Sequence, residues 1–374
     1  LDQQIFRLLD KTNAPATNDW DVPLTVQVDG IDSRVLMAPQ ARIPLSDTSN
    51  PVIVDPHSHG FFRVRYDDAL SQRLTAQLMD LTGGQRHRLF DDQFDLVLAG
   101  HLSVADYLSL AGALNGETSR PVWATVSGGF STLAHATGTR SEHAKIGEIW
   151  SSIAQPQLRA LGFERPKDED DPLTNEVRAS LYSSLGSLSH DDAVMSHARQ
   201  IFDGTVETTN ASLEAAAIGV IASTGSRNDY DEVFHRFQKA TSPQAERRYL
   251  FALSRFDDAE AIADLCDRTM DGSIRSQDAA FVLGLTISNR WHGEQAWSFV
   301  TTNWDRISAT VPDNAVGRML GGVEWLEHSD VPAVHAFLDG HEVPQAKLSI
   351  LQHRERLDIH LALARRIGTE VAAL

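Results

Sequence analysis

Hydrophobic and polar residues alternate with a period of two over the first part of the chain, as they do in half-buried β-strands. The apolar residues that recur at every second position are Leu24, Val26 and Val28, and later Phe62, Val64 and Tyr66. Two short apolar runs, at residues 35–37 and 52–54, lie between these segments, and turn-forming Pro, Gly, Asp, Ser and Asn residues separate them. This spacing predicts a small antiparallel β-sandwich over residues 1–66.

After Tyr66 the hydrophobic period changes to that of an α-helix. The first apolar residues at helical spacing are Leu70, Leu74, Leu78 and Leu81, followed by Phe90, Phe94, Val97 and Leu98. Residues that can start further helices are Ser103, Asp191, Asn210, Asn228, Ser242, Asp257 and Ser276. Helix pairs therefore repeat about every 30–40 residues, the length of a helical-hairpin repeat. We predict a mainly α fold, with a degenerate HEAT-like α-solenoid over residues 67–374 and a mobile loop at the acidic run 166–172.

The composition is that of a globular protein with more than one domain. With 374 residues, 42% of them hydrophobic, the chain is long enough to bury two or more cores. Its longest apolar stretch, around residues 215–222, is far shorter than the ~18–20 residues that a membrane span requires. Residues 1–11 do not form a signal peptide, and the missing initiator Met suggests an excerpt from a longer protein. We therefore expect no membrane partner.

Charge and cysteine content narrow the possible partners and the compartment. The 51 acidic and 33 basic residues give a formal net charge of -18, which argues against nucleic-acid binding because phosphates are repelled. A single cysteine, Cys266, can form neither an internal disulfide nor a multi-thiolate metal site, and it lies between Leu265 and Asp267 on an apolar helical face. We expect Cys266 to be a core residue and the protein to be cytoplasmic.

Two short motifs suggest metal chemistry but lack the residues that would complete a site. The motif Asp55-Pro56-His57-Ser58-His59-Gly60 follows an apolar run, where amidohydrolases carry a histidine pair, but no later β-runs could supply the remaining ligands. We interpret it as a polar hairpin turn. The motif His341-Glu342-Val343-Pro344-Gln345 begins like a zinc-binding helix, but Gln345 is a poor zinc ligand and Pro344 breaks the helix. The sequence therefore shows no metal ligands, no cofactor site and no catalytic residues of its own.

Several small signatures occur in the order that they have in one enzyme family. Those in the first hundred residues are Gln3-Gln4-Ile5-Phe6, Trp20-Asp21-Val22-Pro23-Leu24, Gly60-Phe61-Phe62-Arg63-Val64-Arg65-Tyr66-Asp67, Arg88-Leu89-Phe90-Asp91-Asp92 and Ala99-Gly100. Later ones are Leu161-Gly162-Phe163, Asp257-Asp258, Ser276-Gln277-Asp278, and Ala296-Trp297-Ser298-Phe299-Val300 with Asn303-Trp304-Asp305. The chain thereby resembles the C-terminal region of zinc aminopeptidases of the aminopeptidase N and puromycin-sensitive aminopeptidase family.

The resemblance implies a β-sandwich with aromatic core residues, followed by a helical domain that closes over a catalytic domain. Residue Asp67 would cap the first helix. The family's substrate-anchoring strand and its H-E-x-x-H motif are absent, so zinc and the general base are expected in the preceding catalytic domain of a parent protein. The expected partners are that parent's N-terminal and catalytic domains and a peptide substrate. Arg275, Gln277 and Arg318 fall in stretches similar to those that line the family's substrate chamber.

Two alternative functions remain open from the sequence. The chain could be a stand-alone HEAT-like scaffold whose concave face binds another protein. It could also be a metal-dependent amidohydrolase that uses His57 and His59.

Overall fold

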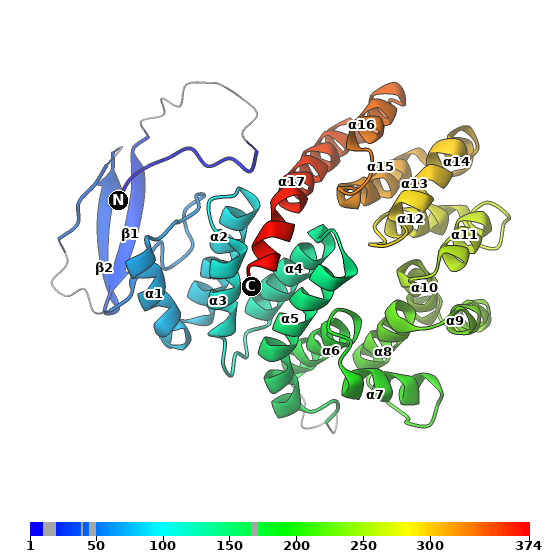
Figure 1. Ribbon diagram of the computed structural model, residues 1–374, viewed down its shortest axis with the longest axis horizontal. Helices are drawn as coiled ribbons and strands as arrows, with labels where there is room; N and C mark the ends of the chain where they lie inside the picture. Colours follow the sequence, from blue (N-terminus) through cyan, green and yellow to red (C-terminus); the bar gives the residue numbers. More distant parts are fainter. Residues whose placement is uncertain (10–19, 39, 45–49, 166–170) are drawn as a thin grey trace. The chain divides into compact units, whose positions relative to one another are not determined.

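The chain begins with a small antiparallel sheet and is helical thereafter (Figure 1). The computed structural model describes residues 1–9, 20–38, 40–44, 50–165 and 171–374, with only the backbone at 313 and 314. Strands β1 (Val22–Val28), β2 (Ile31–Met37) and β3 (Val52–Val54) pair in the order β2-β1-β3. The β1–β2 hairpin turns through Asp29 and Gly30, both with positive φ, as a two-residue turn requires. The run 166–170 lies outside the described residues.

The sheet buries one apolar face and holds the following segment against it. Its buried residues are Leu24, Val26, Met37, Val52 and Val54, and Phe62, Val64, Tyr66 and Leu70 pack onto them. The alternation at residues 62–66 does not form a strand, so this part of the sequence prediction was wrong. The physical reason is that the backbone of Val64 bonds to side chains instead: its N–H donates to Asp92 Oδ2 (3.2 Å) and its carbonyl accepts from Gln93 (3.0 Å). Phe61, expected in the core, is fully exposed.

Helices fill the chain from Asp68 onward, at the position where the hydrophobic period changes. In chain order they are α1 (Asp68–Ala76), η1 (Leu78–Asp80), α2 (Gly83–Leu98), α3 (Val104–Gly112), α4 (Arg120–Ala136), α5 (Arg140–Leu161), α6 (Pro172–Ser187), α7 (Asp192–Phe202), α8 (Ala211–Thr224), α9 (Arg227–Lys239), α10 (Pro243–Ala252), η2 (Leu253–Arg255), α11 (Ala259–Arg268), α12 (Ser276–Ile287), α13 (Gly293–Thr302), α14 (Trp304–Thr310), α15 (Asp313–Met319), η3 (Leu320–Trp325), α16 (Val331–Gly340), η4 (Pro344–Ala346) and α17 (Lys347–Ala372). The predicted mainly α fold, with a small antiparallel β part and a solenoid-like helical region, is confirmed.

Side-chain caps start most of the helices at or near their predicted positions. The side chains of Asp67, Ser103, Asp191, Asn210 and Ser242 each accept a hydrogen bond from the first turn of their helix, as predicted. Three other predicted starts were displaced by one or two residues. The N-cap of α9 is Ser226 rather than Asn228, that of α11 is Asp258 rather than Asp257, and Ser276 is the first residue of α12 behind Arg275.

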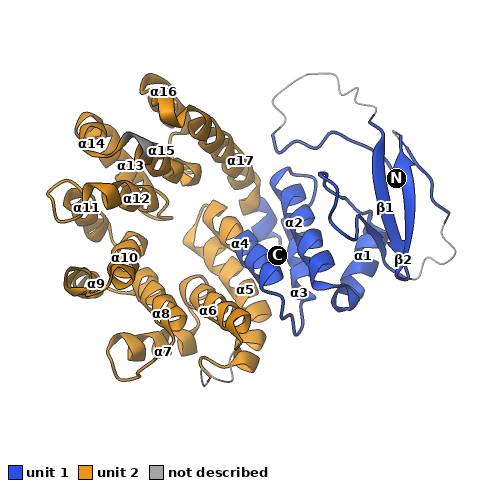
Figure 2. Ribbon diagram, turned by 180° about the vertical axis from the view of Figure 1, so that it is seen from behind, with its two compact units in different colours: residues 1–130, 369–374 blue, residues 131–368 orange. Residues whose placement is uncertain are grey.

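The chain divides into two compact units, residues 1–130 with 369–374 and residues 131–368 (Figure 2). In the second unit, helices α6, α8, α10 and α12 pack one after another, and α7, α9 and α11 each pack on this row from its outer side (Figure 1). Cys266 on α11 is buried in the apolar core of this unit, as predicted. The domain limits 1–66 and 67–374 stay a prediction.

Candidate functional site

The three residues that the sequence suggested for a substrate chamber lie on neighbouring helices of the second unit. Arg275 is the N-cap residue of α12, Gln277 is in the first turn of α12, and Arg318 is in the last turn of α15. Helix α12 packs against both α10 and α15. All three side chains belong to exposed residues.

Arg275 is already engaged in ion pairs with two carboxylates. Its Nε donates to Asp278 Oδ2 (3.0 Å), and its Nη2 donates to Glu246 Oε1 on α10 (2.8 Å). The hydrogen bond to Asp278 and the charges of both carboxylates raise the pKa of Arg275. Arg248 on α10 pairs in the same way with Glu214 on α8. Arg275 therefore takes part in a set of ion pairs between successive helices.

Arg318 instead belongs to a row of arginine and phenylalanine side chains. Its guanidinium lies 5.4 Å from the ring centre of Phe281 on α12. That ring lies 6.4 Å from the ring of Phe251 on α10, and the guanidinium of Arg247 lies 5.2 Å from the Phe251 ring centre. We call Arg247, Phe251, Phe281 and Arg318 the arginine–phenylalanine strip.

The strip is accessible and carries positive charge in an acidic chain. Both rings are half-buried, both arginines are exposed, and neither guanidinium pairs with a described carboxylate. Gln277 lies four residues before Phe281 and Leu285 four residues after it, so helical spacing puts both on the same face of α12. Guanidinium groups beside aromatic rings can bind a carboxylate together with apolar side chains.

Sequence reasoning singled out Arg318 and Gln277 but missed the other members of the strip. Arg247 and Phe251 are four residues apart on α10 and could have been found as a pair on one helix face. The contact between Phe251 and Phe281 depends on how α10 packs against α12. Helical spacing within one segment carries no information about that packing.

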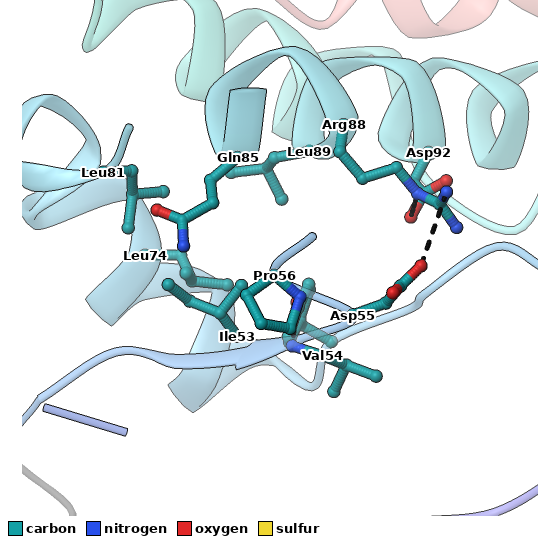
Figure 3. Close-up of a pocket in the computed structure, with 11 residues that line it drawn as sticks. Ile53, Val54, Asp55, Pro56, Leu74, Leu81, Gln85, Arg88, Leu89 and Asp92 are labelled. Carbon is teal, nitrogen blue, oxygen red and sulfur yellow. Dashed lines mark hydrogen bonds and ion pairs between the residues drawn. The ribbon is translucent and has the colours of Figure 1, made fainter. Parts of the chain in front are cut away.

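A small cavity in the first unit lies between β3 and α2 (Figure 3). Its lining residues are Ile53, Val54, Asp55, Pro56, Tyr66, Leu74, Leu81, Gln85, Arg88, Leu89 and Asp92. The space open to the centre of a water molecule is about 10 Å³, so the cavity has room for about one water molecule. This cavity is therefore too small to bind a peptide.

The polar residues beside this cavity hold the segment at residues 60–67 onto α2. Arg88 donates to Asp92 Oδ2 (2.9 Å) and to the carbonyls of Gly60 (3.2 Å) and Phe62. A Cβ at Gly60 would lie 2.0 Å from the Phe62 ring, which explains the glycine. Burial raises the pKa of Asp92. Two of the sequence signatures, around Gly60 and around Arg88, thus meet to fasten one segment to a helix.

The two motifs with metal-like spacing do not form a metal site. His57 Nε2 lies 2.7 Å from Asp32 Oδ2 in an exposed turn after β3. His341 follows the end of α16 and Gln345 lies in η4, so the two do not share a helix. Across the described ranges, no group of three or more His, Cys, Asp or Glu residues is arranged to hold a metal ion. In the same ranges, no helix combines the length and apolarity needed to cross a membrane.

Comparison with known proteins supplies the family. The sequence model of the ERAP1-like C-terminal domain matches residues 51–359, which is most of the chain. This chain belongs to the ERAP1-like C-terminal domain family. The match covers β3, the arginine–phenylalanine strip and almost all of the helical region. The resemblance to the C-terminal region of an aminopeptidase, inferred from the signatures, is thereby confirmed.

Curated relatives of this ERAP1-like domain are aminopeptidases by name. Aminopeptidase M1-D of Oryza sativa subsp. japonica is 28% identical over 69% of this chain and 30% of its own length. Aminopeptidase M1 of Arabidopsis thaliana is 24% identical over 71% of this chain and 31% of its own length. The puromycin-sensitive aminopeptidase of Caenorhabditis elegans is 22% identical over 76% of this chain and 31% of its own length. The chain thus spans about a third of the length of the relatives it matches, and it corresponds to their C-terminal, non-catalytic part.

Proposed function

We propose that this chain works as the C-terminal part of a zinc-dependent aminopeptidase that removes N-terminal residues from peptides. The match of residues 51–359 to the ERAP1-like C-terminal domain, together with relatives named as aminopeptidases, carries this proposal. In such an enzyme zinc would polarise the scissile carbonyl and activate a water molecule. The described residues here include no set of ligands for it, so the zinc would belong to a separate catalytic domain. We propose a cytoplasmic location for the whole protein.

The role of the helical unit in this enzyme would be to receive the part of the peptide that lies beyond the cleaved bond. Its partners would be the catalytic and N-terminal domains of the same protein, over which it closes. Arg318, Gln277 and Arg275 would line the chamber, with Phe281 as an apolar contact beside Arg318. The exposed arginines of the strip support this, because neither guanidinium is neutralised by a described carboxylate. Positive charge at this surface would attract the C-terminal carboxylate of a peptide.

The test is Arg318→Ala in the full-length enzyme, assayed with a long peptide and with a short aminoacyl-arylamide. A charge-assisted contact contributes ~1.5–3 kcal/mol, so we expect KM for the long peptide to rise roughly tenfold or more. If Arg318 contacts the distal end of the peptide, a short arylamide would not extend to it, and its KM should not change. Arg365→Ala is the matched control, because Arg365 is also an exposed arginine without a described carboxylate partner but lies on α17. Equal effects of Arg318→Ala on both substrates would reject the proposed role.

Arg275 should behave differently from Arg318 in the same assay. Because Glu246 and Asp278 already pair with it, a peptide carboxylate would have to compete with both for the guanidinium. We therefore expect Arg275→Ala to raise KM for the long peptide less than Arg318→Ala does. A larger effect of Arg275→Ala would show that the ion pairs open when substrate binds.

A further inference from the structure

The start of α5 contacts residues that lie more than a hundred positions later in the second unit. Repeats of an α-solenoid normally contact only their neighbours. Here Arg140 forms a bidentate ion pair with Asp257, which lies 117 residues later in the chain. Its Nη1 donates to Asp257 Oδ2 (2.6 Å) and its Nη2 donates to Asp257 Oδ1 (3.0 Å). His292 Nε2 lies 3.0 Å from the same carboxylate, and Arg290 donates to the carbonyl of Thr137. The helical array is therefore closed by polar contacts between its beginning and its later helices.

The indole of Trp291 stands at the centre of this closure. The guanidinium of Arg140 lies 4.1 Å from the Trp291 ring centre, and that of Arg290 lies 4.6 Å from it. The imidazole of His143, one turn along α5 from Arg140, lies 5.5 Å from the same ring. We call Arg140, His143, Asp257, Arg290 and Trp291 the Trp291 clasp.

One side of the clasp is anchored rigidly. The buried Asn289 side chain accepts hydrogen bonds from the N–H groups of Trp291 and His292, both at 3.0 Å. It also donates to the carbonyls of Ser254 (2.9 Å) and Phe256 (3.0 Å), next to Asp257. Asp257 and Trp291 are thus fixed to each other through Asn289. Any opening of the clasp must move the start of α5 away from this fixed pair.

His143 lies near positively charged groups, and no described carboxylate forms an ion pair with it. The groups that act on it are Arg140 from its own helix, Arg290 from the loop after α12, and the titratable His135 and His190. The nearby carboxylates contact other groups: Asp257 binds Arg140, Glu142 accepts from Gly138 and Thr139, and Oε1 of Glu327 lies 2.9 Å from His135. Glu142 and Glu327 also act electrostatically on Arg290. Burial, reinforced by Arg290 and the other cations, lowers the pKa of His143 to about 4.

We propose that His143 is a proton switch, and that its protonation releases the start of α5 from Trp291 and Asp257. In the closed clasp a charged imidazolium would lie near the guanidinium groups of Arg140 and Arg290, and no described carboxylate would be its own counter-ion. When α5 moves away, the imidazole reaches solvent and can take up a proton freely. The inference concerns the second unit alone and does not depend on the proposed aminopeptidase function.

The direction of the pH effect follows from the lowered pKa. The closed clasp retains its full stability above the ordinary histidine pKa of about 6.5 and loses it as the pH falls from there toward about 4. At about pH 5.5 the open form holds close to one proton on His143 and the closed form almost none. The equilibrium constant for opening should therefore be about tenfold higher at pH 5.5 than at pH 7.5.

The experiment is hydrogen exchange measured by mass spectrometry on the whole chain at pH 7.5 and 5.5, corrected for the intrinsic effect of pH on exchange. Protection at residues 139–145 reports on opening, because local exchange follows the opening equilibrium. In the unmodified chain we expect the protection factors at residues 139–145 to be about tenfold lower at pH 5.5 than at pH 7.5. His143→Phe keeps a ring against Trp291 but cannot titrate. Its protection factors should fall roughly threefold or less between pH 7.5 and pH 5.5. His235→Phe, an exposed histidine on α9, is the matched control and should behave like the unmodified chain.

Two further variants keep the proposal open to refutation. Asp257→Asn removes the charge that holds Arg140 and should lower protection at residues 139–145 already at pH 7.5. If His143→Phe does not fold, His143→Gln serves in its place with the same expectation. The proposal is overturned if the unmodified chain keeps its protection at pH 5.5, if the His143 variant loses as much as the unmodified chain, or if Asp257→Asn has no effect.

Discussion

Replacing Arg88 with alanine should destabilise the first unit by several kcal/mol. The Arg88 side chain is largely buried, and its positive charge compensates the buried carboxylate of Asp92, with Nε 2.9 Å from Asp92 Oδ2. The Arg88 Nη1 atom also lies 3.8 Å from Asp55 Oδ2. The side chain also donates to the carbonyls of Gly60 and Phe62, which belong to the segment that β1 and β3 do not hold by strand pairing. Removing one partner of a buried ion pair costs about 3–5 kcal/mol, mainly because the remaining charge is left uncompensated. We expect a loss of about 4 kcal/mol, since Arg63 still contacts Asp92 at 3.2 Å.

Chemical denaturation followed by fluorescence measures this loss, and a double variant tests its cause. If the uncompensated charge is responsible, then Asp92→Asn added to Arg88→Ala should restore about 1–2 kcal/mol, because a neutral amide is less costly to bury. Arg65→Ala is the control, because Arg65 is an exposed arginine in the segment 60–67. This substitution should change the free energy of unfolding by less than about 0.5 kcal/mol. A loss below about 1 kcal/mol for Arg88→Ala, or no recovery in the double variant, would show that Arg88 does not compensate a buried charge.

Two further predictions concern buried groups in each unit. Glu117 is fully buried, pairs with Arg86 and accepts hydrogen bonds from the N–H groups of Thr118 and Ser119 just before α4. Glu117→Ala should therefore lower the free energy of unfolding by about 3–5 kcal/mol, measured in the same denaturation experiment. Burial raises the pKa of Cys266 to about 12, so the thiol is protonated at pH 8 and should react with iodoacetamide only after the chain unfolds. Rapid labelling of the native chain would contradict the burial of Cys266 in the core.

The hydrophobic pattern predicted the fold class because the period is a local property. The change of period at Tyr66 coincides with the first helix, which Asp67 caps as expected. The segment 62–66 was assigned wrongly because its alternating residues do pack on the sheet, while its backbone hydrogen bonds go to side chains on α2. Period alone reports which side chains face the core and does not report the backbone partner.

The candidate site shows the same limit at the level of tertiary contacts. The family resemblance led to Arg318 and Arg275, but their local environments differ, because Arg275 pairs with Glu246 on α10 while Arg318 lies over Phe281 on α12. The Trp291 clasp joins Arg140 to Asp257, which lies 117 positions later in the chain. No local pattern in the sequence distinguishes His143 from the other scattered histidines, since two of the groups around it, Arg290 and Trp291, come from a distant part of the chain.

An assay of the purified chain itself tests whether it is a non-catalytic region of a larger aminopeptidase. Metal content is measured after purification, and turnover of aminoacyl-arylamides is measured with and without added zinc. Because the described residues provide no zinc ligand set and the sequence contains no H-E-x-x-H motif, we expect no stoichiometric zinc and no turnover. Tight one-to-one zinc binding, with turnover that a chelator abolishes, would show instead that the chain carries a catalytic site of its own.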